Sequence, residues 1–244
     1  MSDKVEIEAR ELVKSFAGIR ALDHVDIAVP RGELCGVVGA DGAGKTTLLR
    51  CIAGLYRADG GSVLPGRKGR NEVGFSPQGF HMYPDLTVNE NIEFFGSVYG
   101  LDKKTLSERS DELLHFADLT EHRNRLAGNL SGGMQQKLTL ACSVLHRPPI
   151  LLLDEPTTGV DPISRREFWR LIEVLHTAGT TIMLASAYFD EVERCQHVVF
   201  LHEGRVLADG TVDHLTPGGM DLETAFRNRM SEDAILPGKV GFTR

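Results

Sequence analysis

The sequence predicts an α/β fold with a mostly parallel sheet, and three features of the chain support this prediction. Apolar segments typical of strands alternate with segments of helical periodicity along most of the chain. Residues 150–153 are apolar without a break, as in a central strand that is covered on both faces. Residues 34–49 pass from an apolar run through glycines into helical spacing. A strand, a tight loop and a helix in that order are typical of a parallel sheet.

Two segments of alternating apolar residues open the chain, at residues 5–16 and 21–29. Gly18 lies between them and is a turn signal, so the pattern predicts a hairpin or a pair of antiparallel strands at the edge of the sheet. Phe16 ends the first segment and has two interpretations. It is either a core residue or a ring that stacks on a base, and its position alone favours the core.

The glycine-rich loop fits the pattern G-x-x-x-x-G-K-[ST] from Gly39 to Thr46. Glycines let the backbone curl so that its N–H groups point at phosphate oxygens, and the helix start adds partial positive charge. Lys45 would reach the β- and γ-phosphates, and the Thr46 hydroxyl would bind Mg²⁺. The alternative is a glycine-rich turn with an incidental lysine, but the flanking strand and helix favour a phosphate site. The candidate residues are Gly39, Ala40, Asp41, Gly42, Ala43, Gly44, Lys45, Thr46 and Thr47.

The middle of the chain changes from loop to helical character. Residues 54–66 are rich in loop-forming residues, and residues 73–76 form a short candidate strand. Thr87 and Glu90 have the spacing of a capping box and predict the start of a helix. A second amphipathic helix is predicted over residues 105–116. We therefore expect a helical block at residues 86–147, inserted into the α/β chain.

Ser131, Gly132 and Gly133 precede the last apolar helix of this block. Ser131 is a good N-cap residue, which by itself requires no function. Two glycines in the first turn are harder to explain, because each costs about 1 kcal/mol against alanine in a helix interior. They leave bare backbone at a helix N-terminus, where anions bind.

Asp154 and Glu155 follow the continuous apolar strand. The carboxyl ends of strands in open α/β sheets are where ligands bind. An acidic strand end that merely faces water is common for one carboxylate and less so for two beside a glycine-rich loop. Further along, the pattern predicts helices at 165–175 and 190–194 and strands at 181–185, 198–201 and 205–208, followed by a weakly periodic tail from Met230.

The composition limits the classes of function. With 41% hydrophobic and 25% charged residues, the 244-residue chain has material for a large buried core. Its net charge of −7 gives no support to a protein that coats nucleic acid. Four cysteines stand singly and are expected as buried apolar side chains in a reduced compartment. The polar N-terminus and the lack of an apolar run of about 20 residues predict a cytosolic protein that reaches a membrane only through a partner.

Three motifs in fixed order make the chain resemble the ATP-binding cassette (ABC) family of ATPases. These are GADGAGKTT at residues 39–47, LSGGMQQK at 130–137 and ILLLDEPTTGVDP at 150–162, and the resemblance extends over residues 5–226. The resemblance implies an α/β fold of the P-loop NTPase (RecA-like) class. It implies an ATP-binding core with an antiparallel β subdomain at residues 1–85 and 148–230, a helical signature subdomain at 86–147 and a tail or linker at 231–244.

The family also implies roles for individual residues, with ATP and Mg²⁺ as cofactors. Phe16 matches the aromatic residue that stacks on adenine, which reverses the preference for a core position. Gln78 matches the glutamine that contacts Mg²⁺ or water and touches the transmembrane partner. Glu155 is the implied base for the attacking water and Asp154 holds Mg²⁺ through water, while Lys45 completes the catalytic set. The implied Mg²⁺ ligands are Thr46, Gln78 and Asp154.

Partners follow from the same resemblance. Ser131, Gly132 and Gly133 would act in trans on ATP held by a second cassette, and the loop of Asp161 would meet that opposite subunit. The second cassette is either another copy or a tandem partner. A transmembrane permease subunit would hold the chain at the inner face of the cell membrane from the cytoplasm. No direct nucleic-acid contact and no direct membrane insertion are expected.

Within the family, the chain resembles the cassettes of ABC-2 type exporters for drug efflux and daunorubicin resistance. This resemblance rests on two segments, LTVNENIEFFGSVYGL at residues 86–101 and DLETAFRNRM at residues 221–230. The motifs also resemble the first cassette of tandem-cassette chains. A related branch of ribosome-associated ATPases leaves an alternative open, a soluble ATPase that acts on the ribosome or another nucleoprotein.

Two positions depart from the family pattern. Ala40 stands where most members have proline, which affects loop rigidity. Ala187 stands where members have a histidine that contacts the γ-phosphate, with Ser186 and Tyr188 as the neighbours that could partly substitute. Alanine has no imidazole to hold phosphate or water, so we expect the chain's own site to bind Mg-ATP and to hydrolyse it slowly.

Overall fold

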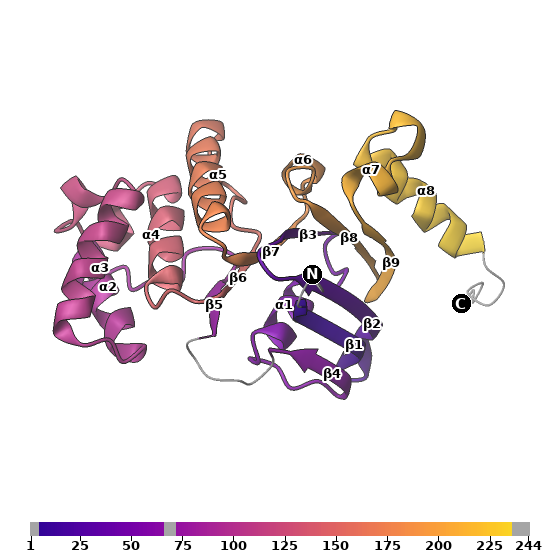
Figure 1. Ribbon diagram of the computed structural model, residues 1–244, viewed down its shortest axis with the longest axis horizontal. Coiled ribbons are helices and arrows are strands. Elements are labelled where there is room, and N and C mark those ends of the chain that lie inside the picture. Colours follow the sequence, from indigo (N-terminus) through magenta and orange to yellow (C-terminus); the bar gives the residue numbers. More distant parts are fainter. Residues whose placement is uncertain (1–4, 66–71, 236–244) are drawn as a thin grey trace. The chain divides into compact units, whose positions relative to one another are not determined.

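The computed structural model describes residues 5–65 and 72–235. Two compact units make up the chain: one combines residues 1–66 with 184–244, and the other contains residues 67–183. Figure 1 labels the helices and strands of both units. Strands that alternate with helices confirm the predicted α/β class, and both parallel and antiparallel pairs occur.

An antiparallel sheet of three strands belongs to the first unit. Its strands, in spatial order, are β2 (Ile19–Pro30), β1 (Val5–Phe16) and β4 (Gly60–Leu64). The predicted hairpin is confirmed by the pairing of β1 with β2, where Ala9 lies opposite Ile27. It forms a sheet of its own with β4 and does not extend the edge of the parallel sheet.

The strand β4 corrects the expectation that residues 54–66 are loop. Gly61 has a φ of +75°, and a β-carbon there would come closer than 3.0 Å to the carbonyl oxygens of Arg10 and Glu11. Glycine therefore lets this strand approach β1 where another residue would collide. A glycine-rich segment looked like a loop because glycine usually weakens strands.

The first unit also holds strands of the mostly parallel sheet. β3 (Leu34–Val38) is buried over its whole length and pairs in parallel with β8 (His197–His202). β9 (Arg205–Gly210) pairs with β8 in the antiparallel direction. The helices of this unit are α1 (Lys45–Ile52), α6 (Phe189–Val192), α7 (Val212–Leu215) and α8 (Leu222–Ile235), with a short 3₁₀ turn η3 (Pro217–Gly219). Thus α8 continues beyond Met230, where the sequence has weak periodicity.

The second unit contains two parallel strands and four longer helices. β5 (Val73–Ser76) pairs with β6 (Ile150–Asp154), and all of β6 is buried, as its apolar sequence predicts. The helices are α2 (Val88–Val98), α3 (Lys103–Phe116), α4 (Gly132–Val144) and α5 (Pro162–Thr177), with 3₁₀ turns η1 (Thr120–His122) and η2 (Ala127–Asn129). The division between the units falls within β7 (Thr181–Ser186), another fully buried strand.

Capping residues set where the helices begin. The Thr87 hydroxyl accepts a hydrogen bond from Glu90 N and the Glu90 carboxylate accepts one from Thr87 N, which confirms the capping box of α2. The helices α3 and α5 begin earlier than predicted, because Asp102 and Asp161 cap them. Pro162 at the first position of α5 strengthens that start, since its fixed φ suits a helix and no N–H is lost there.

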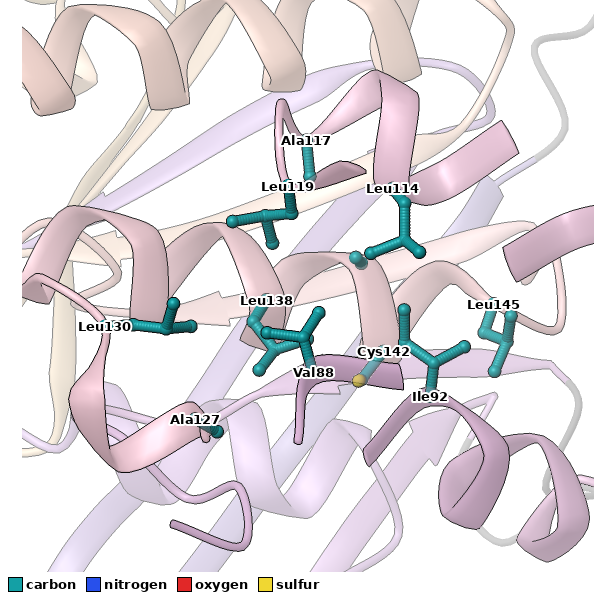
Figure 2. Packing of buried hydrophobic residues seen from close by; sticks show 11 residues of the cluster. Val88, Ile92, Leu114, Ala117, Leu119, Ala127, Leu130, Leu138, Cys142 and Leu145 are labelled. Atoms are coloured by element: carbon teal, nitrogen blue, oxygen red, sulfur yellow. The ribbon is translucent and has the colours of Figure 1, made fainter. Parts of the chain in front are cut away.

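A hydrophobic cluster joins α2, α3 and α4 within the second unit (Figure 2). Val88 and Ile92 of α2 and Leu114 of α3 are fully buried, and so is Leu138 of α4. Burial of such side chains contributes about 1.5–3 kcal/mol each, so the cluster stabilises the helical part of the unit. Most of the helices expected in residues 86–147 therefore share one apolar cluster within the second unit.

All four cysteines are free and buried, which confirms their interpretation as small apolar side chains. Burial raises the pKa of the Cys51 thiol to about 11 and that of Cys195 to about 12. Both therefore stay protonated at neutral pH. In the described ranges, 5–65 and 72–235, no helix has the length and apolar character needed to cross a membrane.

Candidate functional site

The glycine-rich loop connects β3 to α1 in the first unit. Gly44 is the N-cap of α1 with a φ of 107°, and it brings no side chain to the helix end. Lys45 is 4% exposed, and its Nζ donates to the carbonyl oxygens of Gly39 at 2.8 Å and Ala40 at 3.3 Å. A lysine ammonium is thus held over the loop at the start of a helix.

Two glycines of this loop are also required by packing within the unit. A β-carbon on Gly39 would collide with the carbonyl oxygen of Leu201 in β8. One on Gly44 would lie 2.6 Å from the carbonyl oxygen of Ala21. Gly42, by contrast, has open space around it and a φ of +80°. The loop glycines therefore serve the fold as well as the predicted phosphate site.

The start of α1 differs from the starts of other helices in the chain. Asp102 and Asp161 use their carboxylates to accept N–H groups at the starts of α3 and α5. The cap of α1 makes no side-chain hydrogen bond, and its first turn has no acidic residue. An N-terminus of this kind, with Lys45 beside it, suits the phosphates of a nucleotide.

Phe16 lies at the end of β1 and is 42% exposed, so the core interpretation is wrong. Its ring meets the Tyr56 ring edge-on at a centroid distance of 5.3 Å, and Lys14 Nζ lies 5.2 Å from its centroid. Tyr56 also accepts a hydrogen bond from Arg50 at 2.9 Å. An exposed ring with an aromatic neighbour is able to stack on a base. The sequence did not single out Tyr56, because a lone tyrosine in a loop carries no motif.

In the second unit, Gln78 and Glu155 are brought together although 77 residues separate them. The Gln78 amide donates to Glu155 Oε2 at 2.9 Å, and the Thr158 hydroxyl donates to the same oxygen at 3.3 Å. Asp154 is fully buried at the end of β6. Glu155 has a φ of 46°, a strained value for a residue with a side chain. Such strain costs about 1–3 kcal/mol and clusters at functional sites.

The start of α4 confirms Ser131 as an N-cap, whose hydroxyl accepts the N–H of Met134 at 3.4 Å. Ser131 and Gly132 are exposed, whereas Gly133 is buried. Asp161 caps α5 in the same unit by accepting the N–H groups of Ile163 and Ser164, each at 3.0 Å. Hydrogen bonds from the side chain and backbone of Ser164 hold the pKa of Asp161 below its ordinary value. The Asp161 side chain therefore stays an anion at neutral pH.

Ala187 follows β7, and the two neighbours proposed as substitutes for a histidine differ in environment. Ser186 is 1% exposed. Its hydroxyl donates a hydrogen bond to Glu191 Oε2 at 2.6 Å and accepts one from Tyr188 N at 3.0 Å. Glu191 is itself 2% exposed. Ser186 is thus engaged in a buried hydrogen bond, while Tyr188 is 42% exposed. Of the two, only Tyr188 retains access to a bound group.

Comparisons with known proteins identify the family of the chain. The family model described as "ABC transporter" matches residues 22–158. The probable multidrug ABC transporter ATP-binding protein YbhF of Escherichia coli is 39% identical over 217 residues, which cover 86% of this chain and 38% of that protein. The daunorubicin resistance ATP-binding protein DrrA2 of Streptomyces coeruleorubidus is 37% identical over 238 residues, 93% of this chain and 74% of that protein.

Solved structures show the same fold. An ATP-binding subunit of an ABC transporter superposes with a TM-score of 0.83 at 27% identity and covers 93% of this chain and all of its own. The dimeric structure of the cassette MJ0796 bound to ADP and Pi has a TM-score of 0.76 at 24% identity. The match covers 84% of this chain and 98% of that chain. The chain spans little more than a third of the length of YbhF, 38%. Its motifs, fold and relatives together establish that the chain belongs to the ABC transporter family, among the ATP-binding cassettes.

Proposed function

We propose that this chain binds and hydrolyses Mg-ATP as the ATP-binding part of a membrane exporter, in a head-to-tail pair with a second cassette. The observation that carries the proposal is the contact of Gln78 with Glu155 directly after the buried Asp154. A carboxylate fixed by an amide beside a buried acid suits a base that positions water. Relatives named for multidrug transport and daunorubicin resistance support export as the process that is driven.

Nucleotide binding would rest on the first unit. The N-terminus of α1, whose N-cap makes no side-chain hydrogen bond, and the Lys45 ammonium would face the triphosphate. The exposed Phe16 ring would stack on the adenine. Positive charge that is fixed before the reaction stabilises the charge that develops on the transferred phosphoryl group. Asp41 and the other exposed loop residues would line the opening.

Hydrolysis would rest on the carboxylates of the second unit. Glu155 would take the proton of the attacking water as the oxygen bonds to the γ-phosphorus and the bond to the β-phosphate oxygen breaks. Gln78 and Thr158 would hold the Glu155 carboxylate in place. Mg²⁺ prefers oxygen ligands and keeps several waters, so Asp154 and Gln78 of the second unit have the donor chemistry that would hold it. The Thr46 hydroxyl at the start of α1 in the first unit is a donor of the same kind. Bound there, the ion would neutralise phosphate charge.

Two partners complete the proposal. The exposed Ser131 and Gly132 would contact ATP on a second cassette, either another copy or a tandem partner. A permease would dock on the second unit near an aromatic patch, in which Tyr83 and Phe94 are 46% and 40% exposed and pack edge-on at 4.7 Å. Exposed apolar side chains that gather in this way are typical of protein contacts. The chain would therefore work from the cytoplasm, at the inner face of the membrane.

The alternative of a soluble ATPase for the ribosome or another nucleoprotein is not favoured. The net charge of −7 opposes contact with nucleic acid. The relatives described above carry names that refer to multidrug transport and to resistance. Export is therefore retained as the proposed role.

Replacement of Glu155 by glutamine tests the proposal. The amide cannot take a proton, so Glu155→Gln should trap ATP and hold two cassettes together. Light scattering with Mg-ATP should show a dimer whose lifetime exceeds that of the wild type by about a hundredfold, in line with the loss of one general base. Lys45→Ala is the control that should prevent ATP binding. A monomer at saturating Mg-ATP in Glu155→Gln would refute the proposed mechanism.

A further inference from the structure

The helices α4 and α5 lie alongside one another in the second unit, and two contacts join them (Figure 1). Gly133 at the start of α4 faces Ser164 at the start of α5. One turn further along both helices, Lys137 Nζ lies 2.7 Å from Glu167 Oε2. The Lys137 side chain is 9% exposed, so the ion pair is partly shielded from water. The two helices therefore run in the same direction with matched starts.

The first contact distinguishes the two glycines of the signature. A β-carbon on Gly133 would lie closer than 3.0 Å to both Cβ and Oγ of Ser164. A β-carbon on Gly132 would meet nothing within 4 Å. Gly133 must therefore be glycine because of a neighbour in this same chain, whatever it does toward a second cassette. Of these two glycines, Gly132 is the one with open space around it.

The contact continues to the loop before α5. Ser164 donates its backbone N–H to Asp161 Oδ1 at 3.0 Å, and its hydroxyl also bonds to that carboxylate. A line of direct contacts thus leads from Gly133 through Ser164 to Asp161. On its other side, α4 is anchored in the apolar cluster by Leu138 and Cys142 (Figure 2). Close-packed elements of this kind transmit displacement because they have no free volume to absorb it.

We propose that Ser164 is a positioning residue that couples the start of α4 to the loop of Asp161. This inference rests on the proposed function, which sets the start of α4 against the ATP of a second cassette. When that start is drawn toward the nucleotide, Gly133 presses on Ser164 and Asp161 moves with it. The Lys137–Glu167 pair keeps α5 in register during the movement. ATP held by one cassette would thereby set the loop of the other.

A stability cycle tests the contact without any nucleotide. Gly133→Ala should lower the melting temperature by about 3 °C or more, as a loss near 1 kcal/mol does in a chain of this size. In the Ser164→Gly background, Gly133→Ala should lower the melting temperature by less than about 1 °C, because the colliding β-carbon is gone and the cost of glycine in α5 is common to both proteins. Ser164→Ala keeps the β-carbon and should not rescue. Gly132→Ala is the matched control, with a melting temperature within about 1 °C of wild type, since surface substitutions have small effects.

Hydrogen exchange gives the local readout in the same variants. The amides of Ile163 and Ser164 should exchange faster in Gly133→Ala and return to the wild-type rate in the double variant with Ser164→Gly. Equal melting temperatures for Gly132→Ala and Gly133→Ala would overturn the proposal. Rescue by Ser164→Ala as complete as by Ser164→Gly would overturn it too.

The ATP-dependent pairing of two cassettes tests the coupling between the start of α4 and the loop of Asp161. All variants in this test also contain Glu155→Gln. Gly133→Ala should weaken ATP-dependent pairing about tenfold, and Ser164→Gly should restore it, as expected for directly coupled residues. If stability is restored and pairing is not, Gly133 serves the partner's nucleotide alone and the positioning role is refuted. If the single variant Glu155→Gln fails to pair with ATP, the proposed function is contradicted. The amide exchange of Ser164 would then still test the contact between Gly133 and Ser164.

Discussion

At the scale of single residues, the surroundings of Ala187 bear on the prediction that the chain's own site hydrolyses ATP slowly. The adjacent hydroxyl of Ser186 is buried and bonded to Glu191, so it cannot turn to a phosphate without breaking a 2.6 Å hydrogen bond. An intramolecular hydrogen bond contributes about 0.5–1.5 kcal/mol net, so turning the Ser186 hydroxyl away would cost stability. The exposed Tyr188 offers at most a phenol where a histidine would offer an imidazole.

Ala187→His should therefore raise steady-state ATP turnover. An imidazole there would hold the γ-phosphate and the water, and a group in that role contributes about a hundredfold or more. Malachite-green or coupled assays in the presence of the partner cassette measure the change. Tyr188→Phe is the matched control, and it should lower residual turnover only if the phenol substitutes for the histidine. No gain in Ala187→His would show that hydrolysis is limited elsewhere.

At the scale of elements, capping boxes could be read from the sequence more reliably than starts made by a lone aspartate. Thr87 and Glu90 form a two-residue signal, and both of its hydrogen bonds are present. Asp102 and Asp161 also cap helices with a side-chain acceptor, but each is a signal of one residue only. The predicted starts of their helices are two or three residues late. The strand β4 was missed because its glycines fit only when the carbonyls of β1 are known.

Thr87→Ala should destabilise the second unit through α2. The variant loses the side-chain acceptor for Glu90 N and leaves that donor without its cap. Losses of N-caps cost about 1 kcal/mol, with a range of 0.5–2. Urea denaturation followed by circular dichroism measures the shift, with Thr87→Ser as the control that keeps the hydroxyl. A midpoint equal in Thr87→Ala and Thr87→Ser would show that the cap contributes nothing.

The candidate site was predictable to the extent that its residues stand in contiguous motifs. The spacing of residues 39–47 predicted a loop before a helix, and that of residues 130–137 predicted a helix start. The structure has both. The contact of Gln78 with Glu155 joins two segments far apart in the chain. The family resemblance pointed to each residue separately, and their contact became visible only in the structure. Tyr56 and Thr158 belong to no motif, and they became visible only through their neighbours in space.

At the scale of the whole molecule, a buried carboxylate links distant parts of the first unit. Asp23 in β2 is 7% exposed and binds Arg20 at 2.5 Å, while Arg205 in β9 donates to it at 2.6 Å through Nε. Hydrogen bonds from Arg20 lower the pKa of Asp23 from its ordinary 3.8, and those from Arg205 add to the effect against the opposing effect of burial. The unfolded chain thus binds a proton at Asp23 at a higher pH than the folded chain does.

The first unit should lose stability in acid because of this group. A lowered pKa contributes stability that is full above the unfolded pKa near 3.8 and is lost as the pH falls through the lower folded value. Unfolding midpoints in urea between pH 5 and about pH 2 should fall more steeply for wild type than for Asp23→Asn, which cannot titrate. Parallel slopes for the two proteins would exclude Asp23 as a source of acid sensitivity.

The packing of the glycine-rich loop has a consequence for the order in which the protein is made. Gly39 lies against Leu201, and Gly44 lies against Gly204 and Ala21. The ribosome adds residues 201 and 204 some 160 positions after the loop itself. Residues 67–183 form a continuous unit whose contacts are complete before then. During synthesis, the loop reaches its packed form only after β8 emerges, and the part of the chain made first is among the last to be finished.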